Sequence, residues 1–141
     1  MKTRNFALIM GIVFLSIGIL GFIPFFVTKP ATISPELIID TGYGYLMGLF
    51  PINILHNIVH LVFGAWGVGI NGNFVLSRLY SRSLAVIYGV LAIMGLIPFA
   101  NILFGIIPIF GNDVWLHALI AVAGAYFGFI VPSEEKTGAV Q

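Results

Sequence analysis

The chain of 141 residues is 60 % hydrophobic and only 8 % charged, whereas an ordinary soluble domain is about 25 % charged, so the composition excludes a soluble globular protein. The absence of cysteine excludes disulfides, thiolate metal sites and thiol catalysis. A formal net charge of +1 without a basic cluster excludes nucleic acid as a partner.

The charged residues are spaced so that four long stretches contain none: 5–28, 41–77, 83–112 and 114–133. Each stretch reaches the roughly 20 residues that a helix needs to cross the hydrocarbon core of a bilayer. We therefore predict an all-α integral membrane four-helix bundle that runs up-down-up-down through the lipid bilayer as one domain over 1–141. The expected helices are about 6–27, 46–70, 84–107 and 113–131.

The first apolar stretch follows Lys2 and Arg4, in the manner of a secretory signal. It is longer than the apolar core of a usual signal and lacks a small-x-small cleavage site, so we expect an uncleaved first helix. The segment 28–45 that follows it carries two acidic residues and is expected to be a loop.

The second helix carries a polar face. At 100° per residue its polar side chains and one glycine fall on the same side: Asn53, His56, Asn57, His60 and Gly64. Lipid cannot satisfy polar groups, which cost several kcal/mol each when left bare in hydrocarbon. This face is therefore expected to turn inward.

The third and fourth helices each carry a marked feature. The third includes Pro98 within its span. The fourth begins with Asn112 and Asp113, either of which is well placed as the N-cap that accepts bonds from free helix amides. Asp113 and His117 are four residues apart and so share a face of that helix.

The basic residues predict the orientation of the bundle. One side of the membrane receives five of them (Lys2, Arg4, Arg78, Arg82 and Lys136), and the other side receives only Lys29. Because basic residues accumulate on the cytoplasmic side, both termini and the tail 132–141 are expected to be cytoplasmic. The loop 28–45 is then extracytoplasmic.

The sequence also contains a candidate internal repeat. Residues 19–25 (ILGFIPF) match residues 93–99 (IMGLIPF), and Pro51 precedes His60 by the interval that separates Pro108 from His117. The match predicts two helical hairpins related as a parallel repeat, with His60 and His117 at similar depth. Chance similarity between apolar helices built from few residue types is the alternative.

Small residues indicate where helices approach closely. Ala65 with Gly69 and Gly124 with Gly128 are small-xxx-small pairs, which favour close packing of membrane helices.

All three histidines of the chain lie in the predicted second and fourth helices. In an up-down-up-down bundle these two helices face each other across the core, so their polar faces should converge in the outer half of the membrane. Imidazole and carboxylate groups on facing helices can close a site for a divalent metal. The predicted ligands are His56, His60, Asp113 and His117, with second-shell hydrogen bonds from Asn53 and Asn57.

Two other interpretations of these residues stay open. His60 and His117 could ligate haem iron from both sides, with Gly18, Gly21, Gly89 and Gly95 leaving room for the ring, although close packing explains these glycines equally. Alternatively, the polar residues only fasten helices together in a ligand-free structural or accessory subunit of a membrane complex, or in a homo-oligomer.

Catalysis and transport have less support in the sequence. The serines lie in no nucleophile motif, and no glycine-rich phosphate loop is present, so an enzyme is not favoured. A transporter normally carries polar groups through both membrane halves, whereas here the inner halves are nearly apolar.

One block of the sequence resembles a known family. The pattern Pro51-x-Asn53-x-x-His56-Asn57-x-x-His60, together with Gly21 to Pro24 and Asp113-x-Trp115-Leu116-His117, is similar to a bacterial family of small four-helix membrane proteins, domain of unknown function 4383. The similarity extends from about Arg4 to Val131. It implies the four-helix plan and an inner or photosynthetic membrane, and it implies no activity.

Overall fold

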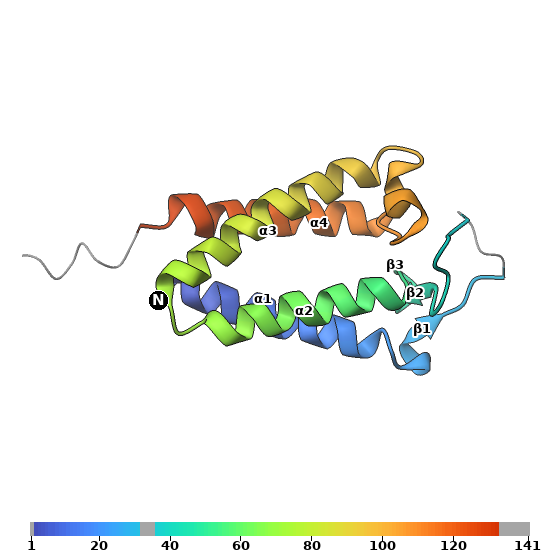
Figure 1. The fold of residues 1–141 in the computed structure, drawn as a ribbon, viewed down its shortest axis with the longest axis horizontal. Helices are drawn as coiled ribbons and strands as arrows, with labels where there is room; N and C mark the ends of the chain where they lie inside the picture. Colours follow the sequence, from blue (N-terminus) through green and yellow to red (C-terminus); the bar gives the residue numbers. More distant parts are fainter. Residues whose placement is uncertain (1, 32–35, 133–141) are drawn as a thin grey trace, which may run out of the picture.

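The computed structural model describes residues 2–31 and 36–132 of the chain. Its main elements are four helices, drawn in Figure 1: α1 (Lys2–Leu20), α2 (Ile54–Ile70), α3 (Phe74–Gly95) and α4 (Asn112–Ala125). A π-helical turn, η3 (Tyr126–Ile130), continues α4. The helices alternate in direction, as the expected up-down-up-down plan requires.

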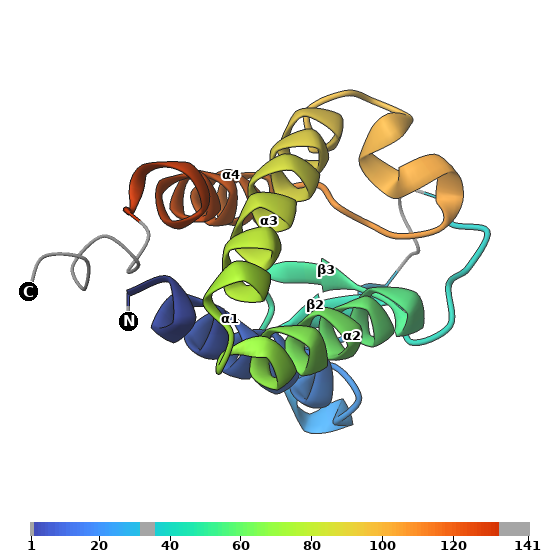
Figure 2. The same ribbon diagram turned by 60° about the vertical axis from the view of Figure 1, so that its left-hand side comes forward.

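The helices pack in two pairs. α1 packs along α2, α3 packs along α4, and the contact between α1 and α3 joins the pairs. Figure 2 shows the α3–α4 pair lying over the α1–α2 pair. Three helical segments are long and apolar enough to cross a membrane, whereas α2 is a shorter apolar helix. The internal repeat stays a prediction.

The end of the bundle that follows α1 carries a small antiparallel sheet, and we call it the sheet end. The sheet has the order β1-β2-β3, with β1 at Val27–Thr28, β2 at Gly44–Leu46 and β3 at Phe50–Ile52. The second helix therefore begins at Ile54 and not near residue 46. Between β2 and β3 the chain turns at Met47 and Gly48, which both have positive φ (53° and 72°) and so cannot continue a right-handed helix.

The first and third helices also end earlier than expected. α1 ends at Leu20, shortly before Pro24 opens the 3-10 turn η1 (Pro24–Phe26). α3 ends at Gly95 rather than near residue 107, so Pro98 lies outside the helix. A proline disfavours helical geometry in the residue before it, which explains why neither helix continues through its proline.

Beyond Pro98 the chain forms η2 (Ala100–Gly105), a 3-10 segment interrupted at Leu103 and Phe104, whose φ values are 45° and 58°. The carbonyl of Gly105 accepts a bond from the Ile38 amide at 2.9 Å. This bond ties η2 to the long loop between α1 and α2.

α3 begins at Phe74 rather than near residue 84, because Asn73 caps it: the Asn73 side chain accepts a hydrogen bond from the Leu76 amide. Arg78 and Arg82 therefore lie inside the helix. A long arginine side chain can extend along its helix to place its charge at the end of the bundle. The position of an arginine in the sequence therefore does not show where the helix begins.

Glycines let the helices of each pair come close together. A Cβ on Gly64 of α2 would lie 2.7 Å from the Leu15 amide and 2.9 Å from the Gly11 carbonyl of α1. In the second pair, a Cβ on Gly124 would lie 2.7 Å from the Ser81 carbonyl. Both pairs therefore rest on backbone-to-backbone contact.

One of the two predicted small-xxx-small pairs is confirmed and the other is wrong. Gly124 and Gly128 both face α3 at close range. Ala65 and Gly69 are exposed, and the described residues leave open space around Gly69. The contact with α1 runs through Gly64, which is about 100° around the helix from Ala65.

The opposite end of the bundle is basic, and we call it the basic end. Arg78 and Arg82 each donate from Nε to the Gly128 carbonyl, at 3.0 and 2.9 Å. The start of α1 and the end of η3 meet there, since Thr3 donates a hydrogen bond to the Phe127 carbonyl. Lys29 follows β1 at the sheet end. Lys136 and the tail from residue 133 lie outside the described residues.

Candidate metal centre

Asn53 fixes the start of α2 and with it the position of His56. Its side-chain oxygen accepts a bond from the His56 amide at 2.9 Å. Its side-chain nitrogen donates to the carbonyls of Ile39 and Ile106 at 2.9 and 2.7 Å. Asn53 thus joins the helix to both loops at the sheet end and positions His56 through the backbone of α2. These three bonds all go to backbone groups, so the second-shell role expected of its side chain stays a prediction.

The entry into α4 corrects the capping prediction. Gly111 (φ 65°, ψ −126°) occupies the N-cap position, with no side-chain cap bond. Asn112 donates to the Leu49 carbonyl at 3.1 Å, and Asp113 lies inside the first turn of the helix. A glycine fits here because this backbone geometry disfavours a side chain. Asp113 is therefore left to face the interior, where the helix dipole favours its negative charge.

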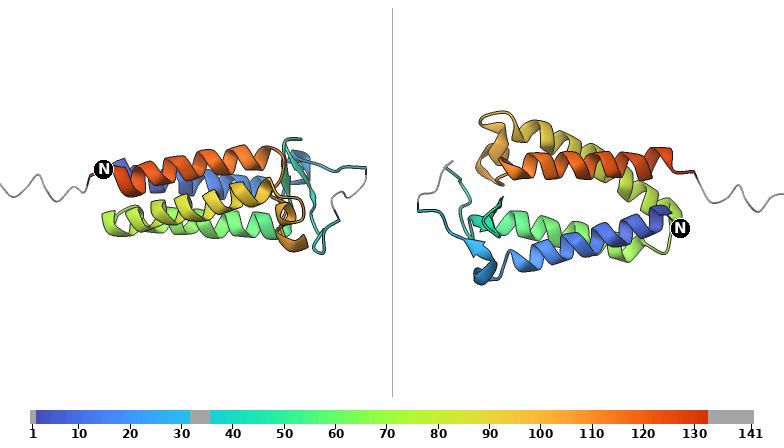
Figure 3. Two further views of the ribbon diagram at one scale, coloured as in Figure 1. Left: turned by 90° about the horizontal axis from the view of Figure 1, so that it is seen from above. Right: turned by 180° about the vertical axis from the view of Figure 1, so that it is seen from behind.

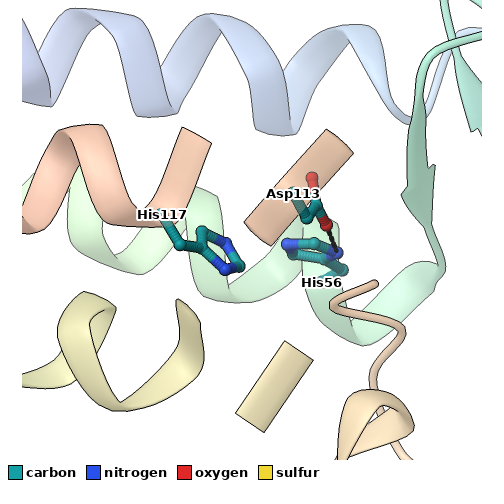
Figure 4. A group of neighbouring side chains, drawn as sticks. All are labelled: His56, Asp113 and His117. Carbon is teal, nitrogen blue, oxygen red and sulfur yellow. Dashed lines mark ion pairs between the residues drawn. The ribbon is translucent and has the colours of Figure 1, made fainter. Parts of the chain in front are cut away.

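Three of the predicted ligands meet between α2 and α4. One ligand atom each from His56, Asp113 and His117 lies within 4.8 Å of the others. His56 Nδ1 lies 3.9 Å from Asp113 Oδ2 (Figure 4). The residues are 5 %, 3 % and 3 % exposed, so the group is enclosed by protein. The convergence expected of the second and fourth helices is present.

His60 lies beside this group but does not belong to it. Its ring stacks on that of His56, with centroids 4.6 Å apart and an interplanar angle of 15°. On its other side it tilts against Phe14 at 5.6 Å. His60 is one helical turn further from the sheet end than His56, which explains why it stacks on the cluster rather than closing it.

Several buried polar atoms of this region lack a hydrogen-bond partner among the described residues: Asn57 Oδ1, His60 Nδ1, Asp113 Oδ2 and His117 Nδ1. Leaving one buried polar group unsatisfied costs about 1–3 kcal/mol, and most native proteins hold few of them. Three of these four atoms belong to predicted metal ligands. The fourth, on Asn57, lies against Gly21.

A cavity of about 360 Å³ opens onto the cluster. His56, His60, Asp113 and His117 line it, and the rest of its wall is apolar and comes from α1, α4 and the segment of β2 and β3. The four predicted ligands thus face one space.

Three of the four glycines considered for a haem pocket are used in close packing. Gly18 faces Leu61 and the Asn57 carbonyl, and Gly95 faces the Ile109 carbonyl. A Cβ on Gly89 would be in ordinary contact with Ala121, 3.8 Å away. Close packing is therefore the role of Gly18, Gly21 and Gly95, whereas Gly89 leaves room for a Cβ.

Two groups next to the site were not predicted from the sequence. The Pro51 carbonyl lies 3.2 Å from His56 Nδ1. The Tyr88 ring meets the His117 ring edge-on at 5.1 Å and is 3 % exposed. The position of a backbone carbonyl cannot be read from the residue types of the sequence. Tyr88 could have been recognised, because Tyr80, Leu84 and Tyr88 form a buried row at four-residue spacing on α3.

Comparison with known proteins places the chain in a family without a known activity. Nothing among the curated proteins and nothing among the solved structures matches it. A family model described as domain of unknown function (DUF4383) matches residues 4–130, which confirms the resemblance seen in the sequence. The chain therefore belongs to the DUF4383 family.

Proposed function

We propose that this chain is an integral membrane protein that binds one divalent transition metal at His56, Asp113 and His117. The observation that carries the proposal is the convergence of three buried ligand atoms within 4.8 Å, from helices that belong to different pairs. Two imidazoles and one carboxylate are a ligand set that suits zinc, iron or manganese.

The hydrogen bonding of His56 supports this role. When Nδ1 carries the proton, it donates to the Pro51 carbonyl at 3.2 Å, and Nε2 keeps its lone pair. Figure 4 draws that second ring nitrogen on the side of His117. A backbone carbonyl that fixes the tautomer and the ring orientation is a common partner of metal-binding histidines.

Three protein ligands leave an open coordination position. Structural zinc sites close their four positions with protein ligands, whereas three-ligand sites admit water or another molecule. His60 Nδ1 is buried and unpartnered beside the cluster, and the cavity faces the same residues. A water or another molecule in the cavity would fill the fourth position.

A ligand-free structural role is the second candidate. His56 and Asp113 approach to 3.9 Å across the two helix pairs, so this contact alone can fasten α2 to α4. Interhelical polar contacts in membranes contribute roughly 0.6–2 kcal/mol. Under this role the substitutions below weaken the fold and change no metal binding.

The membrane placement is also part of the proposal. The basic end would lie on the cytoplasmic side of a bacterial inner or photosynthetic membrane, and the sheet end on the other side. Support comes from the basic residues at one end and from the apolar side chains exposed along the helices, such as Ile9, Val62 and Val122.

The metal proposal is tested by equilibrium dialysis of the detergent-purified protein against Zn²⁺. Asp113→Asn keeps the shape of the side chain and removes its charge, so zinc affinity should fall at least tenfold. Asn112→Ala, one residue away, removes a bond to the Leu49 carbonyl and should leave the affinity unchanged. Equal affinity in wild type and Asp113→Asn would overturn the proposal.

A further inference from the structure

The cavity described above opens sideways, between the two helix pairs. Toward the basic end its lining includes neither the first two turns of α1 nor η3. At the sheet end Leu46, Met47 and Phe50 line it, and Met47 is 58 % exposed. Along its side, two lining residues reach the surface: Val13 of α1 is 40 % exposed and Leu119 of α4 is 66 % exposed.

This opening lies on the surface that would face lipid. α1 packs on α2 and α4 packs on α3, so α1 and α4 form the two rims of the cavity rather than a packed pair. The right-hand view of Figure 3 looks onto this side, with α1 and α4 toward the reader. A molecule dissolved in the membrane can therefore enter without crossing a polar surface.

The size and lining of the cavity indicate an amphipathic small molecule. A volume of about 360 Å³ falls within the roughly 300–1,000 Å³ typical of ligand pockets. Most of the wall is apolar, but its polar part, which we call the floor, consists of His56, His60, Asp113 and His117. The last three of these carry buried atoms without a hydrogen-bond partner among the described residues. An apolar chain alone would leave the histidine nitrogens unsatisfied, so the occupant needs a polar head that can accept hydrogen bonds.

The charges of the floor limit what that head can be. Among the described lining residues Asp113 is the only acid, and none is a lysine or arginine. An anionic head would meet Asp113 without a permanent cation nearby, which is unfavourable in apolar surroundings. A neutral head with carbonyl oxygens can instead accept hydrogen bonds from imidazole N–H groups. The fully buried Phe14 ring, which lies 5.6 Å from that of His60, offers a flat aromatic neighbour.

We propose that this cavity binds a neutral membrane-soluble quinone, whose carbonyl-bearing ring lies against His60 and His117 and whose apolar chain leaves between Val13 and Leu119. The proposal rests on the membrane placement proposed above and holds with or without a bound metal. With a metal held by His56, Asp113 and His117, a head-group oxygen would be available as a further ligand.

The test is equilibrium binding of decylubiquinone to the full chain in detergent, with decylbenzene and oleate as comparison probes. Saturable binding of the quinone, at least tenfold tighter than that of either other probe, is expected. Binding of decylbenzene as tight as that of the quinone would mean a plain lipid groove and would overturn the proposal. Tighter binding of oleate, or no saturable quinone binding, would also overturn it.

Matched variants locate the binding. Val13→Trp fills the mouth and should weaken quinone binding at least tenfold, whereas Ile12→Trp, on an exposed side chain outside the lining, should change it less than twofold. On α4, Leu119→Trp is the variant at the mouth and Val122→Trp is its control outside the lining. Because the two pairs lie on different helices, a folding defect caused by one substitution leaves the other pair to test the proposal. Equal effects within both pairs would contradict a site between α1 and α4.

The head-group contact has its own variant. His60→Phe keeps a ring against Phe14 and removes the imidazole nitrogens, so quinone affinity should fall at least fivefold while decylbenzene affinity stays unchanged. Parallel losses for both probes would contradict the hydrogen-bonding role.

Zinc binding is measured on the same samples. Quinone binding without zinc binding would reject only the metal proposal, and the reverse would reject only this one.

Discussion

Asn53 is the single residue on which the geometry of the site depends most. It caps α2 and makes three hydrogen bonds, two of which reach the loops that cover the sheet end. It is fully buried, so the loss of its side chain would leave two carbonyls and one amide without these partners. His56 follows it by one helical turn, and the position of that imidazole depends on this cap.

Asn53→Ala should therefore destabilise the protein by about 2–4 kcal/mol, since a lost N-cap costs about 1 kcal/mol and each lost hydrogen bond about 0.5–1.5 kcal/mol. Unfolding in mixed micelles with increasing denaturing detergent measures the change. Asn73→Ala is the matched control: Asn73 caps α3 through one exposed bond, and its loss should cost about 1 kcal/mol or less. Equal losses in the two variants would show that Asn53 acts only as a cap.

The residue scale is also where the sequence predicted the site best. His56, Asp113 and His117 could be identified because polar residues are rare in these helices and helical periodicity places them on inward faces. The position of His60 beside the cluster depends on the depth at which α2 and α4 cross. Two helices can share a contact at several depths, and residue spacing along each one does not select among them.

At the scale of elements, the uncharged stretches predicted the number of helices but not their ends. Residues 46–52 are as apolar as a helix, yet they form β2, a turn and β3. Hydropathy cannot separate a short buried strand from the start of an apolar helix. The turn depends on the positive φ of Met47, and a methionine in the sequence gives no reason to expect that backbone geometry.

The glycine contacts give a prediction at the same scale. Gly64→Ala would place a Cβ 2.7 Å from the Leu15 amide, so α1 and α2 must separate, at a cost of about 1–3 kcal/mol typical of overpacking. Gly69→Ala adds its methyl group in open space among the described residues and should stabilise α2 by about 0.5–1 kcal/mol. Unfolding of the two variants, compared with wild type, measures both. A loss at Gly69 as large as that at Gly64 would contradict this packing.

At the scale of the whole molecule, the cluster joins elements that are distant in the chain. His56 lies in the first helix pair, and Asp113 and His117 lie in the second. The pairs touch mainly through α1 and α3, so the space between α1 and α4 stays open as the cavity. One arrangement thus produces both the convergence of polar groups and the lateral opening that leads to them.

The proposed orientation can be tested because the natural chain has no cysteine. Lys29→Cys, at the sheet end, should react with a membrane-impermeant maleimide in intact cells. Gly72→Cys, in the exposed turn between α2 and α3 at the basic end, should react only after the cells are permeabilised. The reverse labelling pattern would mean that the basic end faces outward, against the rule on basic residues.

Elemental analysis of the wild-type protein would show whether His56, Asp113 and His117 share one metal ion. The protein is purified in mild detergent without added metal or chelator. We expect about one equivalent of zinc, iron or manganese per chain, as suits a buried site of two histidines and one carboxylate. A folded sample that contains no transition metal would rule out the metal site and favour a purely structural role for these residues.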